Sequence, residues 1–244
     1  MRVTVLDIET SPNIVYTWRK YEQNAIKKIH GWEILSMAWK EHGARRVEWT
    51  GRPDFPRNEK HLIKRLWRVV DESDVIIHQN GDRFDLPKLR AKFVQHGLPP
   101  TSPFKSIDTK KIAKSNFDFY SNGLDDMADE LGIVRKLQHS GFELWERCMR
   151  GFVIPGAIDH AAWSEMRRYN KRDVVVDDLL YTKLAPFHPN HPNLALIGGG
   201  SNLDCPSCKS KLTQSRGVMV ASVTIKQRRQ CRACGHWFSR SFAA

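Results

Sequence analysis

Two carboxylates lie two residues apart near the beginning of the chain, in the segment VTVLDIET of residues 3–10. This apolar, β-branched segment predicts a strand. Its alternation places Asp7 and Glu9 on the face that carries Val3 and Val5. Two like charges so placed are unfavourable unless a positive charge lies between them, and oxygen ligands suit Mg²⁺ or Mn²⁺. The segment therefore indicates either a metal site or two solvated acids where the strand ends.

A third acid, Asp85, begins a predicted helix directly after a buried strand. The apolar run DVIIHQN of residues 74–80 ends at a Gly81 turn, and Pro87 is tolerated in the first turn of the helix that follows. Asp85 is therefore expected at the carboxyl end of a strand, where α/β proteins gather their ligands. The alternative is an ordinary acid that interacts with the helix dipole.

A fourth acid, Asp173, lies on the longest helical pattern of the chain, four residues after Tyr169. Residues four apart share a helix face, and this face is otherwise apolar. Burying an aspartate there is costly unless the carboxylate is paired or binds a metal. A salt bridge to Arg172 or to a neighbouring lysine is the alternative to a metal.

Four of the five cysteines form two Cys-x-x-Cys pairs near the C-terminus, separated by 22 residues. The segment between them alternates like a β-hairpin, and four thiolates are a common tetrahedral set for Zn²⁺. We predict a zinc ribbon with one structural zinc, because so small a module has too little core of its own. His236 is a further possible ligand, although four cysteines already fill the site. The predicted ligands are Cys205, Cys208, Cys231 and Cys234.

The chain is basic, with a formal net charge of +12. Residues 201–244 hold eight Lys/Arg against one acid. A basic balance favours a polyanionic partner such as nucleic acid, although many basic proteins merely carry solvated Lys and Arg. In the ribbon, basic side chains beside an aromatic ring could follow phosphates and stack on bases; alternatively the ribbon docks on the rest of the chain or on another protein. The predicted contacts are Lys226, Arg228, Arg229 and Trp237.

The elements that must position these residues indicate an α/β domain with a mixed sheet. Strand patterns open the chain, and apolar runs then alternate with helical patterns. Three prolines and three consecutive glycines between residues 186 and 203 are typical of a linker. We therefore predict a catalytic domain over residues 1–190, a linker over 191–203 and a ribbon over 204–244. The predicted strands are 3–10, 14–18, 34–42, 44–51 and 74–80, a short apolar element is 106–114, and the helices are 59–73, 84–96, 121–133 and 160–187.

Three local sequences resemble, in the same order, the motifs of the DEDD superfamily of 3′–5′ exonucleases. They are LDIET with Asp7 and Glu9, HQNGDRFDLPKL with Asp85, and YNKRD with Tyr169 and Asp173. The tyrosine makes this the DEDDy form, and the resemblance covers about residues 1–185. It is closest to the exonuclease domain of family B DNA polymerases and their stand-alone phage and prokaryotic relatives. The fold implied is RNase H-like, with a mixed five-stranded sheet flanked by helices.

This resemblance implies catalysis with two Mg²⁺ or Mn²⁺ ions held by the four acids, with Tyr169 orienting the attacking water. It also implies nucleic-acid contacts by Thr10 of the first motif and by three residues of the second. Gln79 departs from the family, which has His directly before Asn; here the histidine is displaced by one position. The three residues are His78, Asn80 and Phe84.

The function that we predict is release of nucleoside monophosphates from DNA 3′ ends, with single-stranded DNA as the favoured partner. An exoribonuclease or structure-specific nuclease is one alternative, and a non-catalytic nucleic-acid-binding accessory protein is another. A replication or recombination protein is a possible partner. The sequence shows neither a signal peptide nor an apolar run long enough for a bilayer, so we expect no membrane partner and a cytoplasmic location, in the host if the chain is phage-encoded.

Overall fold

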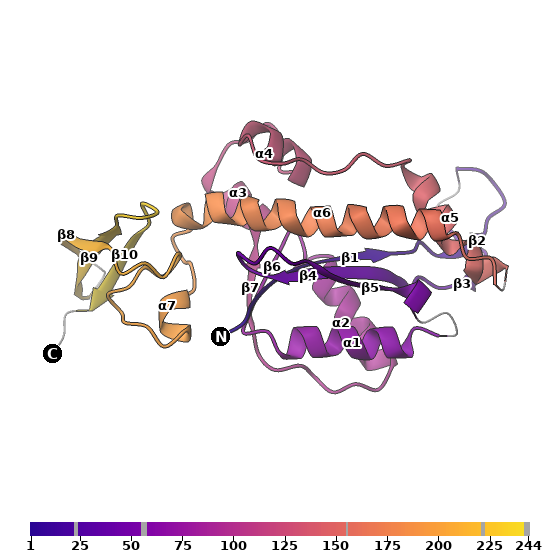
Figure 1. Ribbon diagram of the computed structural model, residues 1–244, viewed down its shortest axis with the longest axis horizontal. Helices are drawn as coiled ribbons and strands as arrows, with labels where there is room; N and C mark the ends of the chain where they lie inside the picture. The colour runs from indigo at the N-terminus through magenta and orange to yellow at the C-terminus, as the bar shows by residue number, and fades with distance from the viewer. Residues whose placement is uncertain (22–23, 55–57, 155, 221–222, 242–244) are drawn as a thin grey trace.

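A mixed five-stranded sheet forms the centre of the computed structural model, which describes residues 1–21, 24–54, 58–154, 156–220 and 223–241 (Figure 1). The strand order is β5-β4-β1-β6-β7. β1 pairs antiparallel with β4 and parallel with β6, so the predicted mixed sheet and RNase H-like fold class are confirmed. The strands are β1 (Val3–Thr10), β4 (Ile34–Glu41), β5 (Glu48–Gly51), β6 (Val75–His78) and β7 (Lys105–Asp108).

Helices cover both faces of this sheet, and alternate residues of β1 divide between two cores. Val3 and Val5 pack with Val174 of the long helix on one face. Leu6 and Ile8 pack on the other face, against the first two helices. The apolar alternation of β1 therefore fixes which side its acids face. The first face is covered by α3 (Thr109–Asn116), α4 (Leu124–Glu130) and α6 (His160–Leu184), and the second by α1 (Lys60–Asp71) and α2 (Asp85–Gln95). The short η1 (Arg52–Asp54) follows β5.

Two elements that the sequence analysis did not predict lie at the end of the molecule towards which β1 runs. One is α5 (Phe142–Val153), which packs against α6. The other is β3 (Lys27–His30), which pairs with β2 (Ile14–Tyr16) outside the main sheet. The predicted strand over residues 14–18 is therefore shorter, and it belongs to a separate hairpin. The Ser11 N–H donates to the Glu33 carbonyl at 2.9 Å and closes the base of that hairpin.

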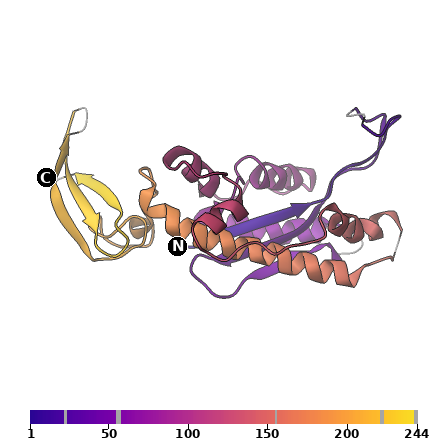
Figure 2. The same ribbon diagram turned by 90° about the horizontal axis from the view of Figure 1, so that it is seen from above.

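The C-terminal ribbon lies beyond the C-terminal end of α6 (Figures 1 and 2). Its three strands are ordered β10-β9-β8. Within the segment that we expected to be a linker, a short helix carries Leu194, which is fully buried in the main core. Part of this segment therefore packs against the main domain, although its flanks are rich in proline and glycine. The elements are η2 (Ala185–Phe187), α7 (Leu194–Ile197), β8 (Thr213–Val220), β9 (Ile225–Cys231) and β10 (Trp237–Ser241).

Two hydrogen bonds hold the ribbon against the main domain. The His236 ring donates from Nδ1 to the Pro186 carbonyl at 2.8 Å, and the Leu194 N–H donates to the Pro206 carbonyl at 2.9 Å. His236 is 3% exposed, so this histidine serves docking. Within the described ranges, no helix combines the length and the apolar composition that crossing a bilayer requires.

Candidate active site

Three of the predicted carboxylates meet where β1 packs against α6. Asp7, Glu9 and Asp173 each offer an oxygen, and these oxygens lie within 4.8 Å of one another. Asp7 and Glu9 leave β1 on the same side because they are two residues apart, and Asp173 faces them from the middle of α6. The register of β1 shifts after Glu9, and bulges of this kind re-aim side chains beside functional sites.

Asp7 is oriented by Asn170, which lies one turn before Asp173 on α6. Asn170 Nδ2 donates to Asp7 Oδ2 at 2.6 Å and to the Asp7 carbonyl at 3.2 Å. Its own Oδ1 accepts a hydrogen bond from Ser36 Oγ at 3.0 Å, and the side chain is fully buried. This chain of hydrogen bonds fixes one oxygen of the Asp7 carboxylate.

Asp173 contacts a lysine through one of its two oxygens, and the other oxygen has no partner in the described part of the chain. Its Oδ2 lies 2.7 Å from Lys136 Nζ, which also donates to the Tyr169 hydroxyl at 3.0 Å. Its Oδ1 is buried and has no hydrogen-bond partner among the described residues. A buried oxygen of this kind is costly unless a cation or donor reaches it. A salt bridge to a lysine, which was the alternative to a metal, and a metal site are therefore compatible, since Lys136 contacts only one of the two oxygens.

Aromatic side chains from α5 and the preceding loop close the site around Tyr169, which is 7% exposed. The centroid of its ring lies 4.6 Å from that of His139 and 5.9 Å from that of Trp145, both edge-on. The Trp145 side chain also favours the ionised form of Glu9 and so lowers its pKa. Residues outside the three motifs therefore act on both Tyr169 and Glu9.

Asp85 lies beside the cluster but outside the group of three. It begins α2, is 2% exposed, and its Oδ1 accepts a hydrogen bond from the Ile8 N–H at 3.0 Å. Its charge acts on both Asp7 and Glu9 and raises their pKa values. The fourth predicted acid is therefore within electrostatic reach of the others, and the backbone of β1 fixes its direction.

Burial raises the pKa values of all four acids, and repulsion by the neighbouring acids adds to it at Asp7 and Glu9. Burial is the largest cause in each case; it lifts the pKa of Glu9 to about 8 and that of Asp85 to about 6, and it raises those of Asp7 and Asp173. Lys136 lowers the pKa values of Asp7, Glu9 and Asp173. Carboxylates that resist ionisation together are characteristic of sites that bind cations.

These residues fit a hard divalent cation. The donors are carboxylate oxygens, one of them buried without a partner, and oxygen donors are the ligands that Mg²⁺ and Mn²⁺ prefer. A cation would also neutralise the repulsion that raises the pKa values of Asp7 and Glu9. Asp7, Glu9 and Asp173 are the residues placed to hold it, with Asp85 adjacent.

An open hollow of about 520 Å³ adjoins the acids. Thr10, at the end of β1, lines it, as the first motif predicts for a substrate contact. Phe84 is 40% exposed, and Lys88 Nζ lies over its ring, 4.8 Å from the centroid. Asn80 adopts a positive φ of 62°, which turns the chain towards α2. The hollow is lined by Thr10, Ser11, Pro12, Lys88, His139, Gly141, Phe142 and Trp145.

His78 does not fit the predicted contact with nucleic acid. Its side chain is fully buried, its Nδ1 accepts a hydrogen bond from the Gly81 N–H at 3.0 Å, and its Nε2 lies 2.7 Å from Ser106 Oγ. A strand that is buried on both faces hides every side chain along it, the histidine included. His78 therefore supports the loop that leads to Asp85.

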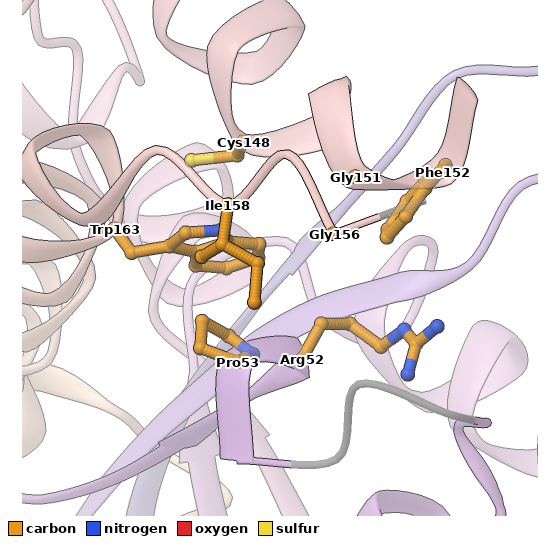
Figure 3. Close-up of a pocket in the computed structure, with 8 residues that line it drawn as sticks. All are labelled: Arg52, Pro53, Cys148, Gly151, Phe152, Gly156, Ile158 and Trp163. Atoms are coloured by element: carbon orange, nitrogen blue, oxygen red, sulfur yellow. The ribbon is translucent and has the colours of Figure 1, made fainter. Parts of the chain in front are cut away.

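A smaller cavity of about 90 Å³ lies between α5, α6 and η1, away from the acids (Figure 3). The Arg52 guanidinium lies 5.3 Å from the centre of the Phe152 ring. Cys148, which is 2% exposed, has its pKa raised to about 12 by burial, so its thiol stays protonated. Cys148 therefore packs as a buried, apolar side chain. The cavity is lined by Arg52, Pro53, Cys148, Gly151, Phe152, Gly156, Ile158 and Trp163.

The four C-terminal cysteines converge on one point. Their sulfurs lie within 4.8 Å of one another, and none forms a disulfide. The Cys205–Cys234 and Cys208–Cys231 sulfur pairs are each separated by 3.6 Å. Tetrahedral Zn²⁺ with bonds of about 2.3 Å requires sulfurs about 3.8 Å apart. The cluster therefore fits a zinc ion and a zinc ribbon.

Three of the four predicted nucleic-acid contacts in the ribbon share one face of its sheet. The register puts Lys226, Arg228 and Trp237 on this face, and the Arg228 guanidinium lies 5.3 Å from the Trp237 ring. Arg229 points to the opposite face, where its Nη2 donates to Thr213 Oγ1 at 2.8 Å. Adjacent residues of a strand point to opposite faces of the sheet. Lys226, Arg228 and Trp237 therefore form one platform, whereas Arg229 supports the sheet from its other face.

Sequence reasoning missed the residues that orient the acids. Asn170 lies inside the third motif, and its spacing of three from Asp173 was a usable signal. Lys136 and His139 lie in a segment without regular secondary structure, and Trp145 lies on a helix that was not predicted. No local pattern linked these three residues to the acids, because the folded path of the chain brings them there.

Two sequence comparisons match this chain. A sequence model of the RNase_H superfamily matches residues 34–185, which is more than half of the chain. A DNA polymerase of Methanocaldococcus jannaschii is 33% identical over 69 residues, covering 27% of this chain and 4% of the polymerase. The family match includes Asp85, Tyr169 and Asp173, whereas Asp7 and Glu9 precede it.

One solved structure shows the same fold. The family B DNA polymerase of the hyperthermophilic archaeon Pyrobaculum calidifontis superposes with a TM-score of 0.55 at 20% identity. The alignment covers 76% of this chain and 25% of that polymerase. This chain therefore spans a small part of both archaeal polymerases, and the likeness at this identity is one of fold.

Proposed function

The chain belongs to the RNase_H superfamily, and from this premise we propose that it is a 3′–5′ exonuclease that releases nucleoside monophosphates from DNA, with single-stranded ends preferred. Membership implies a metal-dependent nuclease. The observation that carries the proposal is the convergence of Asp7, Glu9 and Asp173, whose carboxylates lie within 4.8 Å of one another while Asp173 Oδ1 is buried without a partner among the described residues. A divalent cation held there would polarise the scissile phosphate and make water a better nucleophile at neutral pH.

The chain's own residues would orient the catalytic acids and the tyrosine hydroxyl. Asn170 fixes Asp7, and Lys136 fixes both Asp173 and the Tyr169 hydroxyl. Burial raises the pKa of Tyr169 above its usual value, so the phenol stays protonated and can donate a hydrogen bond to the attacking water. Tyr169 would thus position the water rather than remove its proton.

Substrate binding would extend from this site to the ribbon. Thr10, Asn80 and Phe84 border the acids, where the terminal nucleotide would lie. The ribbon, which we place over residues 204–244 with one structural zinc, would add the platform of Lys226, Arg228 and Trp237. Stacking on Trp237 and pairing of the two cations with phosphates would tolerate any sequence. These assignments, and the boundaries 1–190, 191–203 and 204–244, are parts of the proposal.

A comparison of substrates tests the proposal. DNA and RNA oligonucleotides labelled at the 5′ end, single- and double-stranded, are incubated with Mg²⁺, with Mn²⁺ or with EDTA. We expect metal-dependent ladders that shorten from the 3′ end, fastest on single-stranded DNA. Faster degradation of RNA would identify an exoribonuclease instead. Binding without any metal-dependent cleavage would identify a non-catalytic nucleic-acid-binding protein.

A further inference from the structure

A two-stranded hairpin, residues 14–30, projects from the end of the molecule opposite the ribbon; we call it the arm. It comprises β2, β3 and the turn between them, and Figure 2 shows it extending away from the helices at the upper right. The Ile26 N–H donates to the Tyr16 carbonyl at 2.9 Å, and Tyr16 pairs with Lys27. The arm is therefore a formed element, joined to the main domain only at its base.

Aromatic and basic side chains dominate the surface of the arm. Tyr16, Trp18 and Tyr21 are 60%, 82% and 86% exposed. The arm carries four basic residues against one acid, Glu22. Lys20 Nζ lies 5.5 Å from the Tyr21 ring, so charge and aromatic surface alternate within a few ångströms. The four basic residues are Arg19, Lys20, Lys27 and Lys28.

These side chains are exposed to solvent and do not pack into a core. Every described residue from Tyr16 to Ile29 is exposed, so the arm contributes no side chain there to a core. An isolated two-stranded hairpin is marginally stable in water, and clustered exposed aromatic side chains mark interaction sites. The composition of the arm is therefore explained by a ligand that offers both flat apolar faces and negative charge.

The arm begins at the active site. Its base follows Thr10, Ser11 and Pro12, which line the open hollow beside the acids. Trp18 follows Glu9 by nine residues, a reach of up to about 30 Å in extended chain. A longer nucleic-acid strand whose end occupies the acidic site would extend towards the arm, whereas a dinucleotide offers only one nucleotide beyond its end.

We propose that the arm binds the single-stranded part of the substrate behind its 3′ end, with Trp18 and Tyr21 stacked on bases and the four basic side chains near phosphates. This proposal rests on the proposed exonuclease function. Bases stack on aromatic rings without regard to sequence, and Lys and Arg replace condensed counterions. Charge complementarity and the position of the arm beside the acids favour a nucleic-acid strand over an apolar protein surface.

The test separates binding from hydrolysis. Affinity for a labelled oligothymidylate of about 20 nucleotides is measured in EDTA, and hydrolysis of a thymidine dinucleotide is measured with Mg²⁺. The double variant Trp18→Ala/Tyr21→Ala should bind the oligonucleotide at least about tenfold more weakly and hydrolyse the dinucleotide like the parent. The matched control is Tyr120→Ala, because Tyr120 is 96% exposed and lies outside the arm.

A charge variant provides an independent measurement. Lys27→Gln/Lys28→Gln should reduce the slope of log affinity against log salt by about 2, one for each phosphate contact. Parent-like affinity in the aromatic variant together with an unchanged slope in the charge variant would overturn the proposal. A parent that binds through the arm yet hydrolyses neither substrate would support the arm and contradict the exonuclease function.

Discussion

Lys136 is the residue whose loss most sharply tests the organisation of the site. Its ammonium group contacts Asp173 Oδ2 at 2.7 Å and the Tyr169 hydroxyl at 3.0 Å. Burial opposes its charge, but Asp173 and Tyr169 outweigh burial and raise the pKa of Lys136, so it stays charged. Lys136→Met keeps the length of the side chain and removes both contacts.

The magnitude follows from those two contacts. A hydrogen bond involving a charged group contributes about 1.5–3 kcal/mol. The Lys136 side chain is 26% exposed, and solvent screens it, so we take about 2 kcal/mol for the two contacts together. That free energy corresponds to a fall of about thirtyfold in kcat/KM. The metal concentration for half-maximal activity should also rise, because without Lys136 the acids hold their protons more tightly.

The assay is nucleotide release from single-stranded DNA as a function of Mg²⁺ and pH. Lys111→Met is the control, because Lys111 pairs with Asp82 on the surface and its side chain is 68% exposed. The control should behave like the parent. If Lys136→Met stayed within about twofold of the parent in both kcat/KM and metal requirement, the reasoning from these contacts would be refuted.

Three further outcomes are expected. Burial raises the pKa of Asp177 to about 7 in the folded protein, so the folded state binds more protons than the unfolded state between about pH 4 and 7, and stability falls as pH rises through that window. Asp177→Asn should remove up to about 4 kcal/mol of this loss of stability at pH 8. Urea unfolding of the variant with an unchanged dependence of stability on pH would contradict this. Cys231→Ser should lower the zinc content and the melting temperature of the ribbon while dinucleotide hydrolysis persists, and full zinc content by metal analysis would argue against a four-cysteine site. Asn170→Ala should lower kcat by about tenfold or more with little change in KM, because Asp7 loses its fixed orientation; parent-like kcat would show that Asp7 needs no such support.

Local sequence patterns predicted the acidic residues of the site, because each of these acids lies on a helix or a strand. Asp7 and Glu9 follow from strand alternation, and Asp173 follows from a helical stripe. The mixed sheet was also predictable, since its strands are apolar and separated by turns. Lys136 was not, because it reaches Asp173 from an irregular segment whose course depends on the packing of α5 against α6.

Exposure was the property that the sequence predicted least well. His78 lies on a buried strand and is fully buried, although its motif suggested contact with substrate. Leu194 lies among prolines and glycines and is fully buried in the core. The arm lacks any apolar periodicity because it has no core to cover, so β3 left no pattern that a strand prediction could detect.

The central claim is that a divalent cation held by Asp7, Glu9 and Asp173 cuts DNA from its 3′ end. The most direct measurement is release of a label from the 3′-terminal nucleotide of single-stranded DNA, by the parent and by Asp7→Ala, with and without Mg²⁺. We predict Mg²⁺-dependent release of the labelled monophosphate by the parent and none by Asp7→Ala. Equal release by both proteins, or release by the parent in EDTA, would contradict the account.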